Sequence, residues 1–195
     1  TTLFTFSTIG LLYTSLSILR GKSQGLLAAL LLVGSPIFLQ SGINQVADVP
    51  ISFYYLSIII LFALNDRISE NNKSLIVLAG LTAGLSAWTK NEGLMFVLLI
   101  FVASVLVNIP VNGLKSYLKT ILPFAIGLIP VLIVIAYFKN YIVEPSYVFA
   151  QGSSSIIDKL INPSRFLVVS KVFLKNLFIY NTGAIFVLFV YYILL

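Results

Sequence analysis

Long uncharged, hydrophobic segments alternate with short polar ones along the whole chain. Each segment is near the roughly 20 residues that a helix needs to cross a bilayer. The apolar residues run continuously rather than in the alternation typical of a membrane barrel, and helices pair their own backbone groups in lipid. The pattern therefore predicts an all-α, polytopic transmembrane helix bundle of about seven spans, at residues 1–19, 24–40, 49–64, 74–89, 93–109, 120–138 and 179–195.

We expect residues 1–195 to form a single membrane domain whose long outer loop, at about 139–178, contains interfacial helices. In its last third, basic residues are interleaved with hydrophobic ones, as in a helix that lies in the lipid headgroup layer. Two interpretations of this stretch remain open, a surface helix that extends its lysines to water or a segment that grips a lipid phosphate. The basic residues are Arg165, Lys171 and Lys175.

Composition supports a membrane protein and limits its chemistry. Of 195 residues, 59% are hydrophobic and 9% are charged, against about 25% charged in an average soluble domain. The absence of Cys and His excludes disulfides, thiol nucleophiles, imidazole bases and the usual zinc sites. The net charge of +6 falls largely in short segments between hydrophobic runs, so we expect it to set topology and expect no nucleic-acid partner.

The basic residues also predict an orientation. The first, third and fifth connections carry them, and alternating spans put these three connections on one side, which the positive-inside rule makes cytoplasmic. The opposite, extracytoplasmic side then receives Asp48, the turn at 90–92 and the long segment from 139 onward. The residues in the three connections are Arg20, Lys22, Arg67, Lys73, Lys115 and Lys119.

The first candidate site residue is Asp48, the only carboxylate between Thr1 and Leu64, where one hydrophobic run ends and the next begins. A carboxylate costs roughly 2.5–3.5 kcal/mol at the centre of a span, so such residues tend to serve a function or to sit at a water-filled margin. The alternative is a helix cap, with Asp48 and Pro50 starting the following helix. Both interpretations remain open.

The second candidate is the turn from Lys90 to Glu92. The hydrophobic run before it, 74–89, would be roughly 24 Å long as a helix, short of the roughly 30 Å of hydrocarbon. A recessed end would place Lys90 and Glu92 below the outer surface, in a polar pocket on the side of Asp48. The alternative is a tight turn in which the two side chains pair with each other, and Gly93 suits a turn either way.

These stretches together resemble a known family. The Ala47-Asp48-x-Pro50 step after Gln45, the Thr89-Lys90-x-Glu92-Gly93 turn, and Asn162-Pro163 with Arg165 resemble membrane glycosyltransferases of the GT-C class. The likeness is greatest to the bacterial branch grouped with protein O-mannosyltransferases, aminoarabinose transferases and RgtA/B/C/D-like enzymes.

The resemblance implies an integral, multi-pass protein of the plasma (inner) membrane. It implies inverting transfer of a sugar from a polyprenyl-phosphate donor to a lipid, glycan or protein acceptor at the extracytoplasmic face. In this family an acidic residue in the first outer loop acts as general base. That loop would precede Thr1, so we expect an internal fragment that lacks the principal base and is inactive alone.

The resemblance also implies roles for residues in this chain. Asp48 matches a second acidic position, which positions the acceptor or, in members that use one, ligates a divalent metal. Lys90 would neutralise the charge growing on the phosphate, and Glu92 would orient Lys90 or hold a sugar hydroxyl. Gln45 is a further substrate-binding candidate. Candidates for the carrier phosphate are Arg165, Lys171 and Lys175.

Two other classes of function stay open on the sequence alone. A transporter or channel fragment would use Lys90 and Glu92 as pathway residues and would predict an inverted internal repeat, yet no later segment repeats the Ala-Asp-x-Pro step. A membrane-embedded subunit without catalysis is the third alternative.

Overall fold

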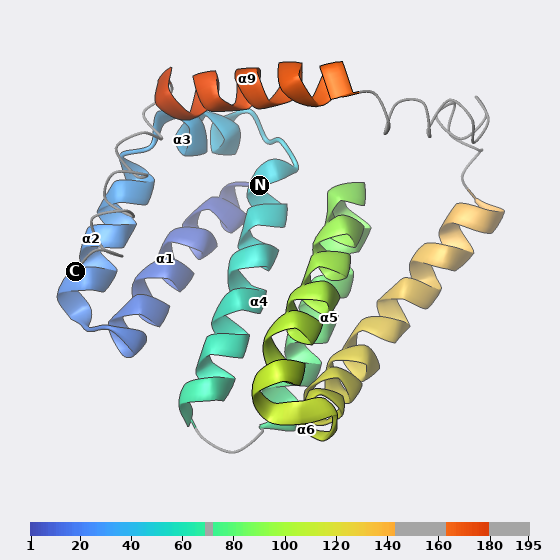
Figure 1. Cartoon of the computed structure of the whole chain (residues 1–195). Coiled ribbons are helices and arrows are strands. Elements are labelled where there is room, and N and C mark those ends of the chain that lie inside the picture. Colours follow the sequence, from blue (N-terminus) through green and yellow to red (C-terminus); the bar gives the residue numbers. More distant parts are fainter. Residues whose placement is uncertain (69–71, 143–162, 180–195) are drawn as a thin grey trace. The chain divides into compact units, whose positions relative to one another are not determined.

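A computed structural model describes residues 1–68, 72–142 and 163–179, and every element in these ranges is an α-helix (Figure 1). The predicted all-α class is therefore confirmed. The chain divides into two compact units, Thr1–Ile142 and Val143–Leu195. The first holds six helices: α1 (Thr2–Leu19), α2 (Lys22–Val33), α3 (Pro36–Ile43), α4 (Asp48–Ile68), α5 (Lys73–Thr89) and α6 (Asn91–Tyr141).

Helix α6 consists of two halves that meet at Gly113. This residue has φ 76° and ψ 168°, outside the helical region, a conformation that glycine adopts without the steric cost of a Cβ. Figure 1 shows the chain turning there, so that the second half of α6 (114–141) runs back along the first half (91–112). The two ends of α6 consequently lie at the same end of the unit.

Within the residues that the structure describes, three helical stretches are long and apolar enough to cross a membrane: Thr2–Leu19, Asp48–Arg67 and Gly113–Tyr141. Helices α2 and α3 together would make a fourth, bent by 63°. The bend arises because Pro36 begins α3, and a residue before proline, here Ser35, is pushed into extended backbone. Helix α5 and Asn91–Val107 are shorter apolar helices. The count of seven spans stays a prediction, since most of the expected span 179–195 lies outside the described residues.

The core of the first unit lies where α4, α5 and both halves of α6 meet. Helix α5 has a face of small residues, and Gly80 approaches the backbone of Phe124 so closely that a Cβ on it would collide with the Phe124 carbonyl. Likewise, a Cβ on Gly127 of α6 would collide with the carbonyl of Val77 on α5. Small residues let helices in membranes pack backbone to backbone. The buried core residues are Ile58, Ile76, Ala79, Ala83, Val97, Ile121, Phe124 and Leu128.

Helices α1 and α4 run in the same direction. At one end the Phe4 ring contacts Phe53 and Tyr54, with ring centroids 5.4 and 5.6 Å apart, and at the other Arg67 Nη1 donates to the Ile18 carbonyl at 2.7 Å. The α1–α2 and α4–α5 connections and the Gly113 turn, which carry the basic residues, share this second end (Figure 1). Asp48 and the α5–α6 turn lie at the first end. The arrangement agrees with the alternation that the sequence predicted.

The second unit is described through α9 (Pro163–Ile179). A proline suits the first position of a helix, where its missing N–H has no intrahelical partner. Large hydrophobic side chains of α9, including Phe166 and Val172, are exposed, as are Lys171 and Lys175. The interfacial placement of α9 stays a prediction, and residues 143–162 of the expected outer loop lie outside the described residues.

Candidate functional site

Asp48 is the first residue of α4. The Ala47 carbonyl accepts a hydrogen bond from the Ile51 N–H at 3.1 Å, so Ala47 occupies the cap position and Asp48 lies in the first turn. The partial positive charge of a helix N-terminus favours a carboxylate there, and Pro50 is tolerated within this turn. Asp48 and Pro50 thus start α4, as the cap interpretation predicted, although Asp48 lies in the first turn rather than at the cap position. Its side chain bonds to Lys90 instead of capping the helix.

Lys90 alone connects α5 to α6, with extended backbone at φ −158° and ψ 150°. The turn is tight because the Gly93 N–H donates to the Lys90 carbonyl at 2.9 Å. A Cβ at Gly93 would collide with the backbone of Ser86 and Ala87 on α5, so close packing of the two helix ends requires glycine at this position. This turn sets the side chains of Lys90 and Glu92 beside each other.

The Asp48 step and the Lys90 turn meet in space although they are 42 residues apart. Lys90 Nζ lies 2.8 Å from Asp48 Oδ1 and 3.4 Å from Glu92 Oε1. We call these three residues the charged cluster. It lies at the surface, with side-chain exposures of 39% for Lys90, 60% for Asp48 and 61% for Glu92. The predicted pairing of Lys90 with Glu92 and the predicted proximity to Asp48 are both present.

The hydrogen bond to Asp48, followed by that to Glu92, raises the pKa of the Lys90 ammonium above its ordinary value of 10.5. Lys90 is therefore charged at neutral pH. With two carboxylates and one ammonium, the charged cluster carries a formal charge of −1.

This raised pKa predicts how the ion pairs depend on pH. A group with a higher pKa in the folded state binds its proton more tightly there, so its stabilisation is complete below the unfolded value of 10.5 and is lost as pH rises through the folded one. We expect the difference in Tm between wild type and Lys90→Gln, measured in detergent, to be constant from neutral pH up to 10.5 and to shrink above it. The difference will be small because exposed ion pairs are screened. The control is Lys90→Arg, whose guanidinium stays charged at high pH, so its Tm should stay above that of Lys90→Gln there. If this Tm difference shrank as much as the one for wild type, deprotonation of Lys90 would not be the cause.

A second pair of polar residues adjoins the charged cluster. Lys139 Nζ, near the end of α6, donates a hydrogen bond to Asn91 Oδ1 at 2.9 Å. Asn91 lies between Lys90 and Glu92 in the chain, so the second half of α6 ends beside the same turn. Neither Lys139 nor Asn91 was predicted from the sequence as a site residue. Chain parity was the available signal, because Lys139 is the first charged residue after a segment predicted to end on the side of Asp48.

The other predicted site residues lie in the connection before α4 and on α9 of the second unit. Gln45 is exposed in the connection between α3 and α4 and has a left-handed backbone, with φ 54°. Lys171 and Lys175 are exposed on α9, and Arg165 lies in the first turn of that helix. The roles proposed for all four residues stay predictions.

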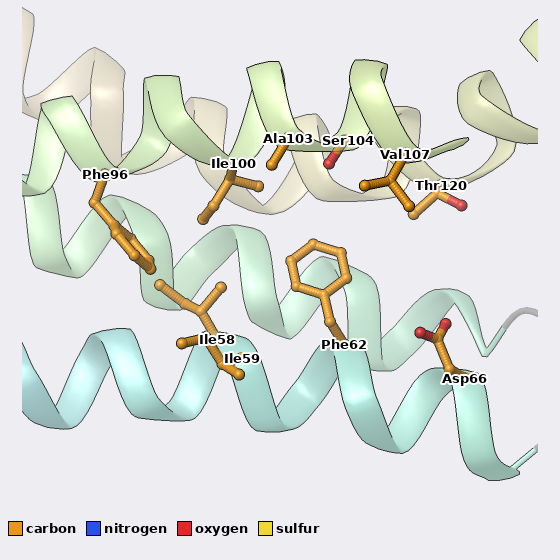
Figure 2. A pocket seen from close by; sticks show the side chains of 10 residues that line it. All are labelled: Ile58, Ile59, Phe62, Asp66, Phe96, Ile100, Ala103, Ser104, Val107 and Thr120. Carbon is orange, nitrogen blue, oxygen red and sulfur yellow. The ribbon is translucent and has the colours of Figure 1, made fainter. Parts of the chain in front are cut away.

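A pocket of about 250 Å³ lies between α4 and α6. Figure 2 shows mainly hydrophobic side chains around it, with Phe96 toward one end and Asp66 and Thr120 toward the other. Its lining includes no member of the charged cluster. This cavity is therefore not the polar pocket that the sequence predicted around Lys90 and Glu92. Those two side chains lie at the exposed surface instead.

Asp48 and Glu92 do not fit a divalent metal as they are arranged. The described residues contain no group of three or more acidic, His or Cys side chains that could hold an ion. Two carboxylates alone would still suffice for Mg²⁺, which takes its other oxygen ligands from water and substrate phosphates. Lys90 Nζ, however, lies within ion-pair distance of both carboxylates. An ammonium there takes the place that a cation would need, so we derive no step through a metal.

The fold and the charged cluster define a helical integral membrane protein with acidic and basic groups joined at one end of its helices. The family model described as dolichyl-phosphate-mannose-protein mannosyltransferase matches residues 1–138, and the chain belongs to this family. Comparison with curated proteins and with solved structures gave no match. The predicted GT-C resemblance is confirmed, and membership identifies a membrane glycosyltransferase that uses a lipid-linked sugar. The match includes the whole charged cluster and ends one residue before Lys139.

Proposed function

We propose that the charged cluster forms part of an active site that transfers a sugar, with inversion, from a polyprenyl-phosphate carrier to an acceptor at the extracytoplasmic face. The observation that carries the proposal is the contact between Asp48 and Lys90, which joins two helix ends within the family match. This contact lies at the end of the unit opposite the basic connections, which the positive-inside rule assigns to the cytoplasm. The family description supports a phosphate-linked mannose as donor and a protein as acceptor.

In the proposed reaction an acceptor oxygen attacks the anomeric carbon from the face opposite the phosphate. The new carbon–oxygen bond forms as the bond to the phosphate oxygen breaks, the electron pair leaves with the phosphate, and the acceptor proton passes to a general base. The resemblance assigns the base to the first outer loop, so Asp48 receives a positioning role. Lys90 bonds to Oδ1 of Asp48, which leaves the second oxygen to accept a hydrogen bond from the acceptor.

Lys90 is assigned a different role from the one that the sequence suggested. An ammonium shared by two carboxylates has little net charge left to offer a phosphate, whereas it holds both carboxylates at fixed positions. We therefore propose that Lys90 positions Asp48 and Glu92, and that Glu92 holds a hydroxyl of the sugar. Preorganised polar groups of this kind favour the transition state because they need not reorient during the reaction.

The test compares two carboxylates on the same helix, in the full-length protein supplied with a labelled polyprenyl-phosphate sugar. Asp48→Asn should lower transfer roughly 10- to 100-fold, because catalysis depends steeply on alignment of the reacting groups. Asp66→Asn, at the other end of α4, is the matched control and should keep wild-type turnover. The product should have the opposite anomeric configuration to the donor.

Equal turnover of Asp48→Asn and wild type would limit Asp48 to a structural role, and a retained anomeric configuration would overturn the inverting mechanism. Family membership favours transfer over the transporter alternative. A wild-type protein that binds donor and transfers nothing would favour the non-catalytic alternative.

A further inference from the structure

The charged cluster has the wrong sign to hold the donor phosphate by itself. Its two carboxylates and one ammonium sum to −1, and both carboxylates contact the Lys90 ammonium. Like charges a few ångströms apart repel, most strongly where water is partly excluded. A phosphate that gains negative charge as the sugar departs would therefore be destabilised beside Asp48 and Glu92, unless a further cation adjoins it.

Among the residues that the structure describes, Lys139 is a cation that no carboxylate pairs with. Its described side-chain hydrogen bond goes to Asn91 Oδ1, a neutral amide oxygen, at 2.9 Å, and its side chain is exposed. An ammonium has three donors, so this bond fixes the direction of Lys139 and leaves two donors for a ligand. Adding Lys139 to the charged cluster brings the formal charge of the whole group to zero.

Asn91 provides two further features that suit an anion. Because its Oδ1 accepts from Lys139, its amide NH₂ group points away from the ammonium and can donate to a phosphate oxygen. Asn91 is also the first residue of α6, where free backbone N–H groups and the helix dipole favour negative charge. The amide and the ammonium thus offer donors side by side.

We infer that Lys139, held by Asn91, binds the phosphate of the lipid-linked donor, while Lys90 organises the carboxylates that face the sugar and the acceptor. This inference rests on the proposed function and names the phosphate subsite within it. It places the phosphate on the side of the turn where the second half of α6 ends. A lysine at the end of an apolar helix can also simply extend its charge to the headgroup layer, and the experiment must separate these two roles.

The experiment measures equilibrium binding of polyprenyl phosphate, without sugar, to the full-length protein in nanodiscs of zwitterionic lipid. Lys139→Gln should weaken binding roughly tenfold, a change of about 1.4 kcal/mol. Lys139→Arg, which retains the charge, should bind within a few-fold of wild type. Lys119→Gln, at the opposite end of the second half of α6, is the matched control and should bind as wild type does.

Asn91→Asp provides the decisive comparison. This substitution turns the contact with Lys139 into an ion pair. If Lys139 had only a structural or anchoring role, the ion pair would preserve or strengthen that role, and Tm would not fall. A phosphate role requires the opposite outcome for binding, because the new carboxylate neutralises Lys139 and repels the ligand. We therefore expect Asn91→Asp to weaken binding at least as much as Lys139→Gln, with Tm unchanged or higher.

Wild-type binding in both Lys139→Gln and Asn91→Asp would overturn the inference, as would a wild-type protein that does not bind polyprenyl phosphate. If wild type transfers sugar while these two variants bind normally, the proposed function stands and this phosphate site fails. If the variants lose binding while wild type transfers no sugar, the site stands and the proposed function fails.

Discussion

Replacing Lys90 with methionine is expected to lower sugar transfer roughly 10²- to 10³-fold, the range seen when one preorganised polar group is removed from an active site. The loss should exceed that of Asp48→Asn, because Asp48→Asn leaves Lys90 bonded to Glu92, 3.4 Å away. Without the ammonium, Asp48 and Glu92 repel each other and lose their shared partner. The change should appear as a fall in kcat for transfer from a polyprenyl-phosphate sugar.

Two controls separate this effect from a loss of folding. Lys73→Met replaces the first residue of α5, the helix that Lys90 follows, and lies at the opposite end of the unit. It should keep wild-type turnover. Lys90→Arg keeps the charge but changes the donor geometry, so it should retain more activity than Lys90→Met. A Lys90→Met enzyme with wild-type kcat would remove the charged cluster from the mechanism.

Replacing Gly80 with leucine is expected to prevent α5 from packing against α6. A Cβ at Gly80 would already collide with the carbonyl of Phe124, and Leu128 N would lie 3.1 Å from it. These are backbone atoms that cannot rotate away, so the helices must separate. Overpacking a well-filled core costs about 1–3 kcal/mol, occasionally more. We expect that range for Gly80→Ala, and a larger loss, with little folded protein recovered, for Gly80→Leu.

Gly10 provides the matched control for Gly80. It is a helical glycine on α1 with no atom within 4 Å of an added Cβ. Gly10→Ala should raise stability slightly, since alanine is favoured over glycine in helices by about 1 kcal/mol. Thermal unfolding in detergent gives the comparison. A Tm for Gly80→Ala at or above that of wild type would contradict the close approach of α5 and α6 at this position.

Packing at Gly80 also bears on the site, because α5 ends at Thr89 and carries Lys90 directly after it. A displaced α5 would move Lys90 away from Asp48 on α4. We therefore expect Gly80→Ala to lose more transfer activity than its loss of folded protein explains. A lowered Tm for Gly80→Ala with wild-type transfer activity per folded protein would contradict that coupling.

The class of protein can be predicted from the sequence because the length of the hydrophobic runs is enough to define it. Continuous hydrophobic runs near the length of a bilayer crossing leave helices as the economical structure, and the α-helices of the described residues agree. Alternation of the runs also placed Asp48, Lys90 and Glu92 at one end. Periodicity could not reveal the bend between α2 and α3. The hydrophobic run continues through Pro36, but the helical backbone is interrupted before it.

The sequence by itself determined that this is a helical membrane protein with no histidine or cysteine chemistry, and that Asp48 and the Lys90 turn share one end of the helices. Only the tertiary structure decided which charges touch. It bonded Lys90 to Asp48 and Glu92 and brought Lys139 to Asn91, 48 residues away. The physical reason is that spans fix the depth of a residue along the membrane normal, whereas lateral neighbours depend on close packing. Here that packing comes from contacts such as Gly80 with Phe124 and Gly93 with Ser86.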